Sequence, residues 1–133
     1  MAIHEYSVKT QGNTKISEHF RVREFACKDG TDSVMIASEL VWTLEKIRKH
    51  FNRPVIINSA YRTPTHNKAV GGSPSSRHLL GQAADIRVKD VPPSTVYAFC
   101  SSLLTTGGVG KYDTFTHVDV RQKKSRWDYT KKK

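Results

Sequence analysis

The decisive stretch of the chain is residues 59–85, SAYRTPTHNKAVGGSPSSRHLLGQAAD, taken together with a short THVD segment near the C-terminus. Near the end of the first stretch, His78 and Asp85 place an imidazole and a carboxylate seven residues apart around a glycine-containing turn. The THVD segment supplies a second such pair, His117 and Asp119. Two imidazoles and a carboxylate form a three-ligand set suited to zinc, with a fourth position left open. The pattern therefore predicts a metal centre built from two separate parts of the chain.

The length and composition predict a single domain over residues 1–133. Of these 133 residues, 37% are hydrophobic and 26% charged, which is enough for one hydrophobic core but not two. We expect an extended lead-in at residues 1–16 and a basic tail at residues 122–133. No apolar run approaches the roughly 20 residues of a membrane span, so no span is expected.

The N-terminal sequence MAIHEY has no basic segment followed by an apolar stretch, so no signal peptide is expected. This predicts synthesis in the cytoplasm, whichever compartment the protein finally acts in. Cys27 and Cys100 lie far apart in the sequence, with no Cys-x-x-Cys pair. Without a secretory signal, two free and partly buried thiols are expected, and neither is assigned as a metal ligand.

The charge of the chain favours polyanionic partners. Twenty-two Lys and Arg residues against twelve Asp and Glu residues give a formal net charge of +10. Nucleic acid, an anionic membrane face and an anionic cell-wall polymer would all be attracted by such a field. The sequence disfavours nucleic acid, because it has no zinc-finger spacing, no glycine-rich phosphate loop and no aromatic-basic strand pattern.

Hydrophobic periodicity predicts two helices and three strands. A helix capped by Asp32 or Ser33 and running to about His50 has apolar residues at helical spacing. A second helix begins at the two prolines near residue 92, continues through Leu104 and is ended by the glycines at 107–110. The expected strands cover residues 54–58, 84–88 and 115–121.

The two later strands alternate in polarity, which orients the fold. Val118 and Val120 point to one side of the last strand, whereas His117 and Asp119 point to the other. The expected architecture is α+β, with a central antiparallel sheet, the long helix packed on one face and a cleft on the opposite face. Both polar pairs should lie in that cleft on neighbouring strands.

Several short motifs occur along the chain, and their combined order and spacing are highly specific. They are SAYRTP from Ser59, Asn67, the glycine pair at 71–72, SRHLLGQAADI from Ser76, GVGKY from Gly108 and HVD from His117. From about Phe20 to Arg121 the chain thereby resembles the peptidase M15 family, which contains zinc D-Ala-D-Ala carboxypeptidases and murein endopeptidases. The match is closest to a small branch ending in His-x-Asp.

The resemblance implies a fold and a set of site residues. The fold would be Hedgehog/DD-peptidase-like, with helices on one face of the sheet and a zinc cleft on the other. His78, Asp85 and His117 would hold one zinc ion per chain. Arg62 would polarise the scissile carbonyl or stabilise the oxyanion as a fixed cation, and Ser76 and Tyr61 would contact the substrate.

The general base is harder to assign from the resemblance. Many members of the family have an acidic residue three positions before the last histidine, where it acts as the base. That position is Thr114 here, which cannot accept the proton. We assign Asp119 as the base, since it shares the cleft-facing side of the strand with His117. Two alternatives remain: Asp119 orients His117, or Asp119 binds the metal while His117 has a catalytic role.

The expected function is a zinc metallopeptidase that hydrolyses peptide bonds in bacterial cell-wall peptidoglycan, as a D,D-carboxypeptidase or an endopeptidase. Stem peptides would be the substrates, and the positive charge would help the protein adhere to anionic wall polymers. A phage-encoded lysin, or a bacterial enzyme exported by another route, suits these features. The alternative is a zinc-stabilised, non-catalytic cell-wall binding module, and the residue at position 114 favours it. Nucleic-acid binding ranks a distant third.

Overall fold

A five-stranded sheet forms the centre of the protein in a computed structural model that describes residues 2–131. In spatial order its strands are β3 (Val55–Ser59), β4 (Ala83–Val88), β6 (Thr116–Asp119), β5 (Gly108–Lys111) and β7 (Ser125–Asp128). The pairs from β3 to β5 are antiparallel, and β7 runs parallel to β5 at the edge. The predicted α+β class is confirmed, and the predicted antiparallel sheet gains a parallel edge strand.

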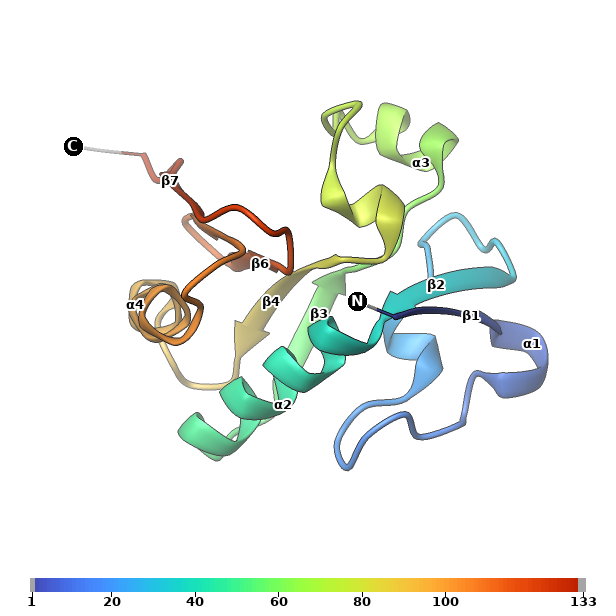
Figure 1. The fold of residues 1–133 in the computed structure, drawn as a ribbon, viewed down its shortest axis with the longest axis horizontal. Helices are drawn as coiled ribbons and strands as arrows, with labels where there is room; N and C mark the ends of the chain where they lie inside the picture. The colour runs from blue at the N-terminus through green and yellow to red at the C-terminus, as the bar shows by residue number, and fades with distance from the viewer. Residues whose placement is uncertain (1, 132–133) are drawn as a thin grey trace.

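Two helices cover one face of this sheet. Helix α2 (Ser38–Phe51) contacts β3 and β4, and helix α4 (Pro93–Leu103) contacts β4, β5 and β6 (Figure 1). The strand residues that face them are buried and apolar, as the alternation predicts: Ala84 and Ile86 on β4 and Val118 on β6. The opposite face of β4 and β6 is therefore left to the polar residues.

The start of the long helix differs from the prediction. Residues Ser33–Ala37 form strand β2, and the helix begins only at Ser38. Asp32 does not cap it, because its carboxylate accepts hydrogen bonds from Ser7 Oγ at 2.7 Å and from the Lys9 amide at 2.6 Å. A contact to a distant segment thus replaces the local cap that the sequence suggested.

The N-terminal segment is also more ordered than an extended lead-in. Strand β1 (Ile3–Ser7) pairs antiparallel with β2 to form a separate two-stranded sheet. A single helical turn, α1 (Val8–Gln11), follows it, and the Ser7 side chain accepts from the backbone of Thr10. The sequence did not indicate this pairing, because the partner of β1 lies about 30 residues away, beyond the reach of a local pattern.

The predicted basic tail contributes to the sheet. β7 lies inside residues 122–133, and the glycines that were expected only to end a helix lead into β5. Arg126 fixes β7 to the end of α4: its guanidinium donates to the carbonyls of Gly107 at 2.7 Å and Ser101 at 3.2 Å, and to that of Leu104. The final lysines, 132 and 133, lie outside the described residues.

The segment between β3 and β4 forms a lobe beyond the start of β4 (Figure 1). It contains helix α3 (Pro64–Ala69) and a 3₁₀ turn, η2 (Arg77–Leu80). Another 3₁₀ turn, η1 (Val22–Phe25), packs against β2 and β3. Gly81 ends η2 with φ of 71°, and a Cβ there would collide with the backbone of Met35. Within residues 2–131, no helix has the length and apolar character needed to cross a membrane.

Candidate metal centre and active site

A cleft of about 650 Å³ opens on the sheet face opposite α2 and α4. The polar residues of β4 and β6 form its floor, the lobe after β3 forms one wall, and the β5–β7 edge forms the other. The polar and charged side chains along its lining are Arg62, Ser73, Ser76, Arg77, His78, Asp85, His117, Arg121 and Ser125. The structure thus brings the two motifs together, as the spacing predicted.

His78 is held by η2 with one ring nitrogen occupied. The Ser76 hydroxyl caps this turn by accepting from the His78 amide at 3.2 Å. The His78 Nδ1 lies 2.6 Å from the carbonyl oxygen of Ala60, so Nδ1 carries the proton and donates it. Its Nε2 keeps a lone pair and lies 3.3 Å from Asp85 Oδ1. This is the tautomer that a metal ligand requires.

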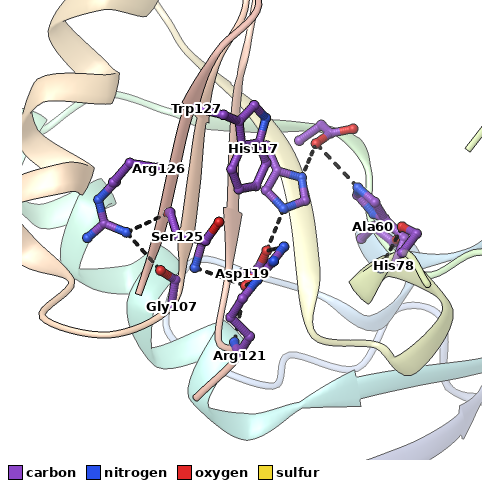
Figure 2. Close-up of polar contacts among 12 residues, drawn as sticks. Ala60, His78, Gly107, His117, Asp119, Arg121, Ser125, Arg126 and Trp127 are labelled. Atoms are coloured by element: carbon purple, nitrogen blue, oxygen red, sulfur yellow. Dashed lines mark hydrogen bonds and ion pairs between the residues drawn. The ribbon is translucent and has the colours of Figure 1, made fainter. Parts of the chain in front are cut away.

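His117 and Asp85 are direct neighbours across the β4–β6 ladder. His117 Nδ1 lies 3.0 Å from Asp85 Oδ1, and His117 Nε2 lies 2.7 Å from Asp119 Oδ2. Figure 2 shows His117 with Asp119 and Arg121 on the side away from His78. Because Asp119 accepts the Nε2 proton, Nδ1 is the ring nitrogen that remains for a metal.

The electrostatics favour the charged forms of Asp85 and His117. Burial disfavours the charged form of Asp85, but the adjacent imidazoles of His117 and His78 outweigh it and hold the pKa of Asp85 well below its usual range. Burial likewise opposes charge on His117, yet its bonds to Asp119 and Asp85 raise its pKa above the ordinary value. In the absence of a metal, the imidazole therefore tends to hold a proton that a metal would displace.

The donor set fits zinc. One ligand atom each from His78, Asp85 and His117 lie within 4.8 Å of one another, and all three residues are buried. Each imidazole has its second nitrogen committed to an oxygen acceptor, and His117 Nδ1 would offer its lone pair once a metal displaces its proton. Two imidazoles and a carboxylate would leave a fourth position of a zinc ion open. These residues would hold the ion.

Asp119 lies behind His117 and does not line the cleft. It has no solvent exposure, and five donors surround its two oxygens. Oδ1 accepts from the backbone of Gly108 and from the amide and Nε of Arg121, and Oδ2 accepts from His117 Nε2 and Arg121 Nη2. Burial raises the pKa of Asp119, but these bonds from His117 and Arg121 lower it far more. The geometry favours the alternative in which Asp119 orients His117.

Arg62 lies beside the candidate metal ligands. Its Nη2 is 3.4 Å from Asp85 Oδ2, its Nε donates to Ser59 Oγ at 3.2 Å, and its Nη1 donates to Asn67 Oδ1 at 3.2 Å. Asn67, which is buried, also donates to the Ser73 carbonyl at 2.9 Å. The guanidinium is therefore a fixed cation on the wall of the cleft.

The two predicted substrate contacts differ in position. Ser76 lines the cleft. Tyr61 does not: its ring packs against the hydrophobic core, so its position gives the predicted contact no support.

An aromatic wall on the β5–β7 side was not predicted from the sequence. Trp127 donates from Nε1 to the Tyr112 hydroxyl at 3.0 Å, and its ring centroid is 5.1 Å from that of His117. Tyr112 stacks on Phe115 with ring centroids 4.4 Å apart. Glycine makes this packing feasible, because a Cβ on Gly110 would collide with the Trp127 indole. The motif GVGKY held Tyr112, but no local pattern pointed to Trp127.

Arg121 was another omission, although its signal was present. It continues the alternation of His117 and Asp119 on the cleft side, and period 2 along a strand places all three on one face. Its guanidinium makes a two-pronged ion pair with Asp119 and lies 5.3 Å from the Trp127 ring centroid.

The fold and site together define a small α+β protein with a candidate three-ligand metal site on an open sheet face. A family model for peptidase M15 matches residues 16–119. The chain belongs to the peptidase M15 family. It is also similar to the zinc D-Ala-D-Ala carboxypeptidase of Streptomyces albus G, with 38% identity over 47 residues. That alignment covers 35% of this chain and 18% of the Streptomyces protein.

Proposed function

We propose that this protein is a zinc peptidase that hydrolyses peptide bonds in bacterial cell-wall peptidoglycan. The observation that carries the proposal is the convergence of His78 Nε2, Asp85 Oδ1 and His117 Nδ1. Each imidazole has its other nitrogen bonded, so the nitrogen beside Asp85 is the one left on each ring for a metal. The family and the Streptomyces relative support the peptide substrate and the metal.

Zinc in such a site lowers the pKa of a water molecule and polarises a carbonyl oxygen. The chain's own residues then orient the substrate. Arg62, fixed by three acceptors, presents positive charge to the oxygen on which negative charge develops. Burial raises the pKa of Tyr112, so its hydroxyl stays protonated while it accepts from Trp127. The Tyr112 proton is thus available for a hydrogen bond to the substrate.

Asp119 acts on this chemistry through His117. By accepting the Nε2 proton it holds the tautomer in which Nδ1 is unprotonated, and the ion pair with Arg121 keeps the carboxylate in place. Under this assignment Asp119 is a positioning residue, since it touches neither the cleft nor the substrate.

A binding module without catalysis is the second candidate, and one observation favours it. Among the described residues that line the cleft, Asp85 is the one acidic side chain, and it belongs to the metal ligands. Position 114 holds an exposed threonine on the turn before β6. A lining without a second carboxylate suits a domain that retains the metal and binds wall peptides.

Adhesion to the cell wall is part of the same proposal. A basic hollow of about 750 Å³ adjoins the cleft and shares Arg77 and Arg121 with it. Lys123 and Lys124 line its far side. Phosphate or carboxylate groups of wall polymers would bind there by charge, and a phage-encoded or exported lysin would use such a surface.

Incubation with purified muropeptides tests the proposal, with products identified by mass spectrometry. Zinc-dependent loss of a terminal D-Ala would assign a carboxypeptidase, and opening of a cross-link would assign an endopeptidase. Cleavage should stop on addition of a chelator and in His78→Ala. If the zinc-loaded protein binds muropeptides and releases no product, the binding module is correct.

A further inference from the structure

A second group of potential ligands lies outside the cleft, where η1 ends and α3 begins. Cys27 follows η1, Asp29 lies in the turn that leads to β2, and His66 lies in the first turn of α3. One ligand atom from each of these residues lies within 4.8 Å of the other two. No sequence motif links these three residues, because only the fold brings them together.

The Thr63 hydroxyl organises this group. It donates to Asp29 Oδ2 at 2.8 Å, accepts from the His66 amide at 3.2 Å as the cap of α3, and lies 4.0 Å from the Cys27 sulfur. Thr63 therefore orients one ligand and anchors the segment that carries another, which is how an outer residue commonly supports a metal site. Cys27 and Asp29 are held close together by a turn in which the Gly30 amide donates to the Cys27 carbonyl at 3.2 Å.

We propose that Cys27, Asp29 and His66 form a second zinc site. A thiolate, an imidazole and a carboxylate are all zinc ligands, and the sulfur disfavours magnesium and calcium. The ligand atoms of a tetrahedral zinc with bonds of about 2.0–2.3 Å stand about 3.3–3.8 Å apart. Side-chain rotations that move the ligand atoms by about 1 Å are therefore enough for the three residues to coordinate one ion. Asp29 is exposed and His66 is half-buried, so a water molecule can take the fourth position.

This ion would have a structural role. It would join the turn before β2 to α3, at the base of the lobe that carries Arg62 and leads to His78. At present this junction is held by the Thr63–Asp29 bond and by the Tyr61 amide, which donates to the Phe25 carbonyl at 3.1 Å. A metal that binds only the folded form adds stability by mass action. The proposal does not depend on peptidase activity.

Cobalt substitution tests the proposal, because the two sites differ in chemistry. The cleft ligands include no sulfur, so a thiolate-to-cobalt charge-transfer band in the near ultraviolet can arise only outside the cleft. Titration of the metal-free protein with Co²⁺ should show this band and reach two equivalents per chain. His78→Ala should lose the cleft ion and keep the band, and Cys100→Ala should keep both.

Cys27→Ser should abolish the band and the second equivalent, while chelator-sensitive cleavage by the zinc-loaded protein persists. His66→Gln and Asp29→Asn, at more accessible positions, should weaken the band in proteins whose circular dichroism is unchanged. The proposal is overturned if folded wild type at saturating Co²⁺ shows no thiolate band, or if the band survives Cys27→Ser. It is also overturned if the band survives both His66→Gln and Asp29→Asn undiminished.

Discussion

Replacing Asp119 by asparagine separates the roles considered for this residue. The Asp119 Oδ1 site faces three donors, two from Arg121 and one from Gly108, whereas the Oδ2 site faces two. An asparagine would therefore place its oxygen at the Oδ1 site and its NH₂ group against His117 Nε2. A donor there favours the His117 tautomer with the proton on Nδ1, which is the atom proposed to bind zinc.

The expected cost follows from this loss of orientation. Removal of a carboxylate partner from a metal-bound histidine lowers metal affinity by about 10- to 100-fold, which corresponds to about 1.4–2.7 kcal/mol. Competition with a zinc-binding dye at fixed pH measures it. The matched control is Asp113→Asn, which removes a carboxylate charge at an exposed turn position before β6 and should leave the affinity unchanged.

Two outcomes would contradict this reasoning. Unchanged zinc affinity with a rate loss of about 10²- to 10⁴-fold would identify Asp119 as the general base. Complete loss of the metal in Asp119→Asn, together with retention in His117→Ala, would identify Asp119 as a ligand.

Three further predictions concern the metal, the cleft cation and the β5 glycine. His78→Ala should abolish binding of the cleft zinc, which elemental analysis measures. The free energy of unfolding of the wild-type protein should fall by about 2.7 kcal/mol when zinc at 100 times its Kd is removed. Thermal melts measure this loss, and melts that do not respond to zinc would contradict the site. Arg62→Lys should keep the fold and the zinc but lose most turnover, since an ammonium group cannot reproduce the planar guanidinium. The control Arg87→Lys, at an exposed position of β4, should remain active. Equal turnover in the two variants would show that Arg62 takes no part in catalysis. Gly108→Ala should lower the free energy of unfolding by about 1–3 kcal/mol through overpacking, because the new Cβ would lie 2.8 Å from Asp119 Oδ1. Urea denaturation measures this loss. An unchanged midpoint would contradict it, because the Asp119 carboxylate would then have moved aside without cost.

The parts of the fold that follow from local patterns were predictable. Period-2 alternation located β4 and β6 and assigned their faces, and helical periodicity together with the proline pair located α2 and α4. β1, β2, β5 and β7 were missed. β1 and β2 pair with each other from distant parts of the chain, the glycines of β5 indicated only the end of a helix, and β7 lies in the segment expected to be a basic tail. Asp32 illustrates the reason: its residue type is a helix cap, but its oxygens are taken by Ser7 and Lys9.

The site shows the same division. The candidate metal ligands belong to compact motifs, so the sequence was enough to select His78, Asp85 and His117, which the structure brings together. The orientation of His117 was not predictable, because it depends on which ring nitrogen faces Asp119 in three dimensions. Trp127 lines the cleft because β7 pairs parallel with β5, and no local sequence pattern indicates this pairing.

The position of β7 at the edge of the sheet has a consequence for motion. The candidate ligand strands β4 and β6 have a hydrogen-bonded neighbour on both sides, whereas β7 lies at the edge of the sheet and pairs with β5. Arg126 and the Trp127–Tyr112 hydrogen bond add to its attachment. Edge segments open locally at a lower free energy than central strands. We therefore expect the Trp127 side of the cleft to open at a lower free energy than its floor, which would widen the cleft laterally without unfolding of the candidate metal site.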